Sequence, residues 1–288
     1  MRLKDLGERA LLRKLAPLGY PQEAPLPPGD DAGGVWADGE VALKGMGPFE
    51  VGFRGVAATA SDLLVKMGRP LGFTLGLFLP EDLEEGFVLE LVRGAAEAAK
   101  RLGAFLLGGD TNRGVEVALT VSGYALAEAP LPRKALPGDL LYLAGDRWER
   151  TGAAIRAHYE GRSLEGFPKI REAAFYPLPR LELLALSGLL RGSLDSSDGL
   201  AETLWQLSEL GVRVELEVLP LYPDVLAFAG SEEAALELVL YGGEEFEAVL
   251  VVPQEGAAAV EARAKAKGLP LFRVGRVVAG EGVYLRGA

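Results

Sequence analysis

The sequence contains no cysteine and only one histidine, His158. The absence of cysteine excludes disulfides, thiol catalysis and cysteine-ligated zinc sites, and a single histidine excludes a multi-histidine metal centre. Any bound metal ion must therefore be held by oxygen ligands. His158 falls in a helical pattern, close to Arg156 and Tyr159 and away from any acidic glycine turn. We expect it to be a surface residue.

The sequence also lacks long apolar runs and basic stripes. No run reaches the roughly 18 to 20 apolar residues of a membrane span, and the N-terminus, "MRLKDLGERALLRKL", has neither the apolar core nor the cleavage site of a signal peptide. The formal net charge of -11 disfavours binding along a nucleic-acid backbone. We expect a soluble, cytoplasmic protein with no nucleic-acid or membrane partner, whose ligand is a small molecule or another protein.

The 288 residues, of which 49% are hydrophobic, suffice for two ordinary domains. A proline-rich stretch at 128–139 separates two predicted strands and is the best candidate for a domain boundary. The sequence thus predicts two α+β or α/β halves, residues 1–130 and 131–288. Apolar periodicity predicts helices at 4–17, 55–68, 82–102, 231–240 and 254–267, and strands at 104–110, 115–127, 140–145, 212–219, 271–278 and 282–287.

The stretch "SLDSSDGL" (193–200) places two aspartates three residues apart where an apolar helix begins. The stripe that starts at Leu200 predicts a helix beginning near Gly199, with Ser197 or Asp198 as its N-cap. Capping does not account for Asp195. A pair of carboxylates at such a turn could hold a divalent cation, while the helix N-terminus receives phosphate oxygens. A simple turn with a cap is the alternative explanation.

Similar acidic turns recur along the chain. "GDDAGG" contains Asp30 and Asp31, "LLGGDTNRG" places Asp110 after an apolar strand, and "YGGEEFE" places Glu244 and Glu245 after another predicted strand. Glycines allow a backbone to approach a ligand closely, and ligands gather at the ends of strands. Each stretch alone could be an ordinary turn.

Asp62 lies inside a predicted helix, where aspartate is unfavourable unless it is solvated or belongs to a site. If these acids converge, only cations can relieve their mutual repulsion, and Mg²⁺ bridging phosphates is the usual occupant of such a cluster. The pattern therefore favours phosphoryl transfer or another nucleotide-dependent reaction. The chain has neither a P-loop nor the motif set of protein kinases.

Six motifs follow one another along the chain: "GDDA" (29–32), "SDLLVKMGRP" (61–70), "GGDT" (108–111), Arg133 followed by "PGD" (137–139), "LDSSDGL" (194–200) and "GGEEFE" (242–247). They occur in the order found in the thiamine-monophosphate kinase family, and the chain resembles that family over nearly its whole length. The family is related to aminoimidazole ribonucleotide synthetase, selenophosphate synthetase and the hydrogenase-maturation carbamoyl dehydratase.

The resemblance implies an aminoimidazole ribonucleotide synthetase-like fold. In it an N-terminal domain would bind ATP and metals and dimerise through its sheet to form a barrel, and a C-terminal α/β domain would pack against it. It also implies direct phosphoryl transfer from ATP to thiamine monophosphate, with Mg²⁺ as cofactor. The implied metal ligands are Asp30, Asp31, Asp62, Asp110, Asp195 and Asp198. Gly109, Asp110, Arg133 and Ser197 would contact ATP, and Glu244 would face the thiamine substrate.

One segment departs from the family pattern. Where the family has a Ser/Thr-Thr-Asp metal-binding segment and then a substrate-contacting histidine, this chain has "VALKGMGPFEVGF" (41–53), with Lys44 or Gly45 in place of acids and hydroxyls. The chain also ends at "GVYLRGA" without a clear match to the aromatic residue that the family uses near its C-terminus. Two alternatives therefore remain: the same ATP site with another acceptor, or a catalytically silent nucleotide-binding dimer.

Overall fold

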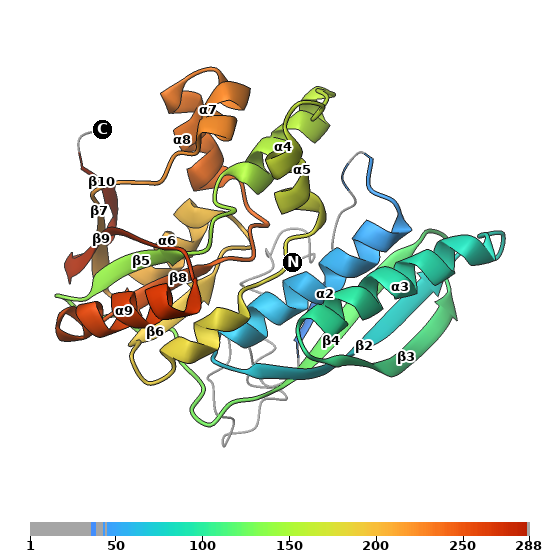
Figure 1. Ribbon diagram of the computed structural model, residues 1–288, viewed down its shortest axis with the longest axis horizontal. Coiled ribbons are helices and arrows are strands. Elements are labelled where there is room, and N and C mark those ends of the chain that lie inside the picture. The colour runs from blue at the N-terminus through green and yellow to red at the C-terminus, as the bar shows by residue number, and fades with distance from the viewer. Residues whose placement is uncertain (1–35, 39–42, 44, 287–288) are drawn as a thin grey trace, which may run out of the picture.

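The computed structural model describes residues 36–38, 43 and 45–286. Within them the chain forms two mixed sheets, one in each half (Figure 1). The first has four strands in the order β1-β4-β2-β3, and the second has six in the order β10-β7-β9-β5-β8-β6. The prediction of two halves that each combine helices with strands is confirmed. The boundary between residues 130 and 131 remains a prediction.

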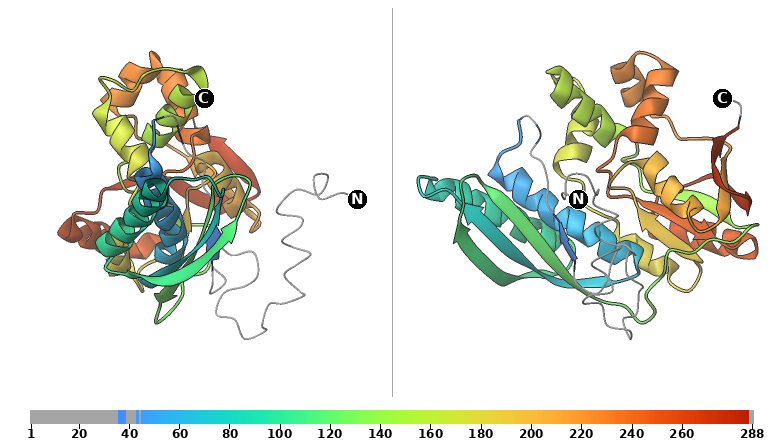
Figure 2. Two further views of the ribbon diagram at one scale, coloured as in Figure 1. Left: turned by 90° about the vertical axis from the view of Figure 1, so that its right-hand side faces the viewer. Right: turned by 180° about the vertical axis from the view of Figure 1, so that it is seen from behind.

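In the N-terminal sheet the inner strand β2 (Arg69–Leu79) pairs antiparallel with β4 (Ala118–Leu126) and parallel with β3 (Phe105–Arg113). The short strand β1 (Trp36–Asp38) pairs antiparallel with β4. Helices α2 (Pro48–Val65) and α3 (Glu85–Arg101) run side by side over one face of this sheet (Figure 2). Between helices and sheet lies a core that includes Phe53, Val56, Leu64, Phe73 and Ala98.

The C-terminal sheet is covered on both faces. Strands β5 (Leu140–Ala144) and β8 (Ala248–Val252) are buried along their whole length, as is typical of central strands. Their alternate side chains belong to two separate cores, one with α6 (Leu200–Ser208) and one with α9 (Ala257–Lys267). The remaining strands are β6 (Gly192–Asp195), β7 (Val212–Leu216), β9 (Leu271–Ala279) and β10 (Gly282–Leu285).

Four helices form a separate cluster above the C-terminal sheet in the view of Figure 1. They are α4 (Arg150–Glu160), α5 (Pro168–Phe175), α7 (Pro223–Ala229) and α8 (Glu232–Tyr241). Their shared core includes Ala153, Ile170, Phe228 and Leu238. Two short 3-10 segments, η2 (Leu181–Leu186) and η3 (Gln254–Gly256), complete the described elements. None of the described helices combines the length and the apolar character needed to cross a bilayer.

The start of α2 corrects the prediction for this region. Sequence analysis begins the helix at residue 55, whereas it starts at Pro48, so residues 48–54 are also helical. The Gly47 N–H donates to a Glu50 side-chain oxygen at 2.9 Å, and proline at the first position favours a helix start. The predicted helix at 4–17 lies outside the described residues.

Candidate functional site

Helix α2 runs directly against strand β6, and this contact brings two predicted site residues into one region. The Ser61 hydroxyl donates to a carboxylate oxygen of Asp195 at 2.9 Å, and Asp62 is the next residue of the helix. Both aspartates are buried, with exposed fractions of 5% for Asp62 and 9% for Asp195. At the end of the helix the Lys66 ammonium donates to the Ser193 carbonyl at 3.1 Å. Asp62 is therefore buried next to this contact between the two halves and is not on a solvated helix face.

The loop after β6 lies beside the loop at 243–247, and the two are joined by backbone hydrogen bonds. The Glu244 N–H donates to the Ser197 carbonyl at 2.7 Å, and the Phe246 N–H donates to the Ser196 carbonyl at 3.1 Å. In the opposite direction the Ser196 N–H donates to the Glu247 carbonyl at 2.9 Å. The motifs "LDSSDGL" and "GGEEFE", which are well separated in sequence, thus form one continuous structure.

Two local predictions about these motifs are wrong. Helix α6 begins at Leu200 with Gly199 as its N-cap, and neither Ser197 nor Asp198 caps it with a side chain. Gly199 has a φ of 95°, a conformation that glycine adopts without strain, so the chain turns into the helix through a glycine instead of a polar cap. The stretch "YGGEEFE" follows helix α8, not a strand.

Asp198 and Ser197 are the more accessible residues of this turn. Asp198 is exposed and Ser197 is half-buried, in contrast to the buried Asp195 and Ser196. Since the helix N-terminus has no side-chain cap among the described residues, its first N–H groups and dipole can act on a ligand. The turn can therefore present a carboxylate and a hydroxyl together with a helix N-terminus.

Glu245 and Glu247, which belong to the loop at 243–247, are fully buried. The Ser196 hydroxyl donates to Glu245 at 2.9 Å, and burial raises the pKa of Glu245 to about 8. Glu247 instead pairs with Arg147 and Arg180, each at 3.2 Å. Such buried carboxyls need partners or a proton, because an isolated charge is costly in a protein interior.

Glu244, the predicted substrate contact, points toward helix α2 and forms an ion pair with Arg54. Its side chain is 27% exposed, whereas that of Arg54 is 1% exposed. Sequence analysis did not identify Arg54, Arg147 or Arg180. The sequence did contain a signal for Arg54. This arginine lies within "GFRGVAATA", a run of small and apolar residues in which a buried charge requires a partner.

Gly109 and Asp110 lie on strand β3, at the edge of the N-terminal sheet. Gly109 pairs with Leu75, and a Cβ on Gly109 would come within 1.9 Å of the Leu75 carbonyl oxygen. Asp110 is exposed, and its carboxylate accepts from the Thr111 N–H and from the Asn112 amide, both at 2.9 Å. These contacts lie within β3 itself.

Arg133 lies in the connection between the sheets. The next residue, Lys134, packs so closely on β6 that a Cβ on Gly192 would meet the Lys134 carbonyl oxygen at 2.3 Å. Two residues before Arg133, the Leu131 N–H donates to the Lys66 carbonyl at 3.2 Å. The segment that contains Arg133 thus passes close to the end of α2 and to the start of β6.

In the part of the chain that the structure describes, no three acidic or histidine side chains are grouped closely enough to hold a metal ion. Asp30 and Asp31 lie outside the described residues, so four of the six predicted metal ligands have a described position. Of these, Asp195 accepts a hydrogen bond from Ser61, the residue that directly precedes Asp62. The oxygen donors present suit Mg²⁺, which prefers a few carboxylates together with phosphate oxygens and water.

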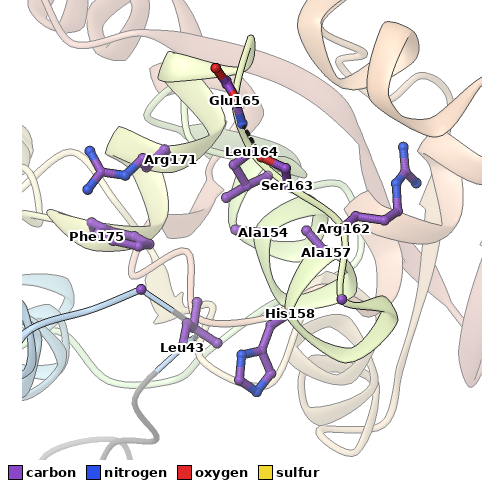
Figure 3. A pocket seen from close by; sticks show the side chains of 12 residues that line it. Leu43, Ala154, Ala157, His158, Arg162, Ser163, Leu164, Glu165, Arg171 and Phe175 are labelled. Carbon is purple, nitrogen blue, oxygen red and sulfur yellow. Dashed lines mark hydrogen bonds between the residues drawn. The ribbon is translucent and has the colours of Figure 1, made fainter.

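Two cavities adjoin the helical cluster. One of about 560 Å³ is lined by α4, the loop after it and α5, and it includes His158 (Figure 3). The other, of about 840 Å³, is lined by residues that include Arg147, Arg150, Arg180 and Tyr222. His158, predicted to be a surface residue, is half-buried and lines the first cavity.

Comparison with known proteins identifies the family. The model for the N-terminal domain of AIR synthase related proteins matches residues 34–129, and the model for their C-terminal domain matches residues 137–287. A thiamine-monophosphate kinase from Pyrobaculum calidifontis is 32% identical over 268 residues, which cover 88% of this chain and 83% of the relative. The chain belongs to the thiamine-monophosphate kinases of the AIR synthase related family. The resemblance drawn from the six motifs is confirmed.

Solved structures confirm the two-domain fold of the thiamine-monophosphate kinase family. A crystal structure of a protein from Thermus thermophilus is 91% identical, covers 100% of this chain and 99% of that one, and superposes with a TM-score of 0.97. AaThiL, complexed with AMPPCP and TMP, shares the fold with a TM-score of 0.85 at 24% identity, covering 100% of this chain and 96% of that chain.

Proposed function

We propose that this chain phosphorylates thiamine monophosphate to thiamine diphosphate with ATP. The main support is the contact network that joins three motifs of the thiamine-monophosphate kinase family. Helix α2 contacts "LDSSDGL" through Ser61 and Asp195, and it contacts "GGEEFE" through Arg54 and Glu244. The name of the Pyrobaculum relative and the AMPPCP and TMP bound to AaThiL give the substrate pair.

The proposed reaction is a direct transfer. A phosphate oxygen of thiamine monophosphate attacks the γ-phosphorus of ATP, the bond from that phosphorus to the β-γ bridging oxygen breaks, and ADP leaves with the electron pair. Most of the rate would come from positioning and from neutralisation of charge. Glu244 would face the thiamine part of the acceptor, and Arg133, Gly109 and Ser197 would lie against ATP.

The carboxylates of Asp62, Asp110, Asp195 and Asp198, together with Asp30 and Asp31, would hold Mg²⁺. When bound, Mg²⁺ would neutralise the charge that the phosphates carry. The Ser61 hydroxyl orients the Asp195 carboxylate for such a role. The uncapped N-terminus of α6 would attract phosphate through its N–H groups and its dipole.

We further propose that the protein acts as a cytoplasmic homodimer formed through the N-terminal sheet. The face of this sheet opposite α2 and α3 carries exposed apolar side chains that a second copy could bury. Phe105 is 71% exposed and Leu107 is 58% exposed, and Phe78, Tyr124 and Leu126 are also exposed. Apolar patches of this kind usually mark an interaction surface.

The direct test incubates the pure protein with ATP, Mg²⁺ and thiamine monophosphate and follows thiamine diphosphate by chromatography. We expect product only when protein and Mg²⁺ are both present. Binding of ATP without any product would reject the proposal and leave the two alternatives. The altered segment at 41–53 favours a changed acceptor, so a screen of other phosphorylated acceptors would then separate that alternative from a silent nucleotide-binding dimer.

A further inference from the structure

From one buried position in helix α2, Arg54 contacts Glu244, Ala174 and Phe246. Its Nη2 forms the ion pair with Glu244, and its Nη1 donates to the Ala174 carbonyl in α5. Its guanidinium carbon lies 5.7 Å from the centre of the Phe246 ring. The side chain is 1% exposed, so these contacts are shielded from water. One residue of the N-terminal half thus holds two residues of the "GGEEFE" loop.

The loop that Arg54 holds has an unfavourable backbone. Glu244 has a φ of 56° and Phe246 a φ of 49°, both in the left-handed region that is unfavourable for a non-glycine residue. Such conformations persist only where the surroundings hold them, and they occur often at functional sites. Arg147 supports the loop as well, since it donates to the Glu245 carbonyl at 3.2 Å and to the Phe246 carbonyl at 3.3 Å.

We propose that Arg54 is a positioning residue for the acceptor substrate. By fixing the Glu244 carboxylate and the ring of Phe246, it sets the direction from which Glu244 meets the acceptor. This inference rests on the proposed function, in which Glu244 faces the positively charged thiamine part. Because α2 also contains Asp62, the same helix would hold Glu244 at a fixed position relative to the metal-binding residues.

A purely structural role for Arg54 predicts a different result from a positioning role. If Arg54 only holds the two halves together, its loss lowers stability and affects the use of ATP and of the acceptor alike. If it acts through Glu244, its loss affects the acceptor selectively. In a protein that already carries Glu244→Gln, loss of Arg54 would then have little further effect, because the effects of substituting coupled residues are not additive.

The experiment measures the KM for thiamine monophosphate, the KM for ATP and the kcat of Arg54→Gln, Arg54→Lys, Glu244→Gln and the double variant Arg54→Gln/Glu244→Gln. Arg93→Gln is the matched control, because Arg93 forms an exposed ion pair with Glu90 on α3. We expect Arg54→Gln to raise the acceptor KM by about 10- to 100-fold, as for loss of a hydrogen bond to a charged group. The ATP KM should stay within about twofold.

We expect Arg54→Lys to recover part of the acceptor KM and the double variant to be no worse than Glu244→Gln. Equal rises in both KM values, or additive effects in the double variant, would overturn the proposal. If Arg54→Gln does not fold, Arg54→Lys provides the same comparison.

A wild-type protein that makes no thiamine diphosphate would reject the proposed function, not the role of Arg54. In that case a crystal structure of Arg54→Gln, or of Arg54→Lys if the first does not fold, decides. A displaced Glu244 side chain supports positioning, and an unchanged one contradicts it.

Discussion

Asp198 is the residue whose substitution best separates a catalytic role from a structural one. It is exposed and does not cap α6, so Asp198→Asn should fold normally, with a change in stability within about 0.5 kcal/mol. If it helps to hold Mg²⁺, Mg²⁺-dependent turnover should fall by about 100-fold, a typical effect of removing a charge-stabilising group. Turnover and melting temperature are measured together, with the exposed Asp82→Asn as the control. Normal turnover would exclude Asp198 from the site.

Glu149 makes stability depend on pH. It is fully buried, burial raises its pKa to about 8, and its Oε2 has no hydrogen-bond partner among the described residues. The folded protein therefore keeps a proton that the unfolded chain releases near pH 4.5, so this stability is present at low pH and is lost as pH rises toward 8.

Glu149→Gln removes this titration while keeping the shape of the side chain. We expect the melting temperature of the variant, relative to wild type, to rise between pH 5 and pH 8. In this range only the wild type releases a proton from residue 149 when it unfolds, so only the wild type is destabilised as pH rises. The measurement is a set of melting curves across that range. A constant difference would show that Glu149 is already ionised at pH 5.

At the scale of elements, the close contact between α2 and α3 depends on glycine. A Cβ on Gly94 would lie 1.8 Å from the Phe49 carbonyl oxygen, whereas a Cβ on Gly86, in the same helix, meets nothing within 4 Å. Gly94→Ala should therefore push the helices apart and destabilise the protein by about 2 kcal/mol. Gly86→Ala should be neutral or stabilising by up to about 1 kcal/mol. Urea unfolding of both variants provides the comparison, and equal effects would contradict the close contact.

Local patterns in the sequence predict most elements but not how the motifs meet. Helix α3 and strands β4 and β5 follow from periodicity and from runs of apolar residues, which are local properties of each segment. The N-cap of α6 was mispredicted since a glycine with positive φ replaced the polar cap. Arg54 and Glu244 are 190 residues apart, and nothing local in either segment specifies their pairing. The acidic turns were visible, whereas the arginines that hold them depend on tertiary structure.

For the whole molecule, the exposed face of the N-terminal sheet leads to a prediction about assembly. Leu107 lies on this face, where it packs over Gly72, and it is 58% exposed. If a second copy covers this face, Leu107→Asp buries an unpaired charge in the interface and should convert dimers to monomers. Val218→Asp is the matched control, since Val218 is 59% exposed but follows β7 in the other half.

Sedimentation velocity at several protein concentrations measures the outcome. We expect wild type and Val218→Asp to sediment as dimers and Leu107→Asp to sediment as a monomer with unchanged secondary structure. A wild type that is monomeric throughout would reject the dimer. A dimer that survives Leu107→Asp would place the interface elsewhere. Because Gly109 and Asp110 lie on the same strand as Leu107, a monomeric variant that also binds ATP more weakly would link assembly to the nucleotide site.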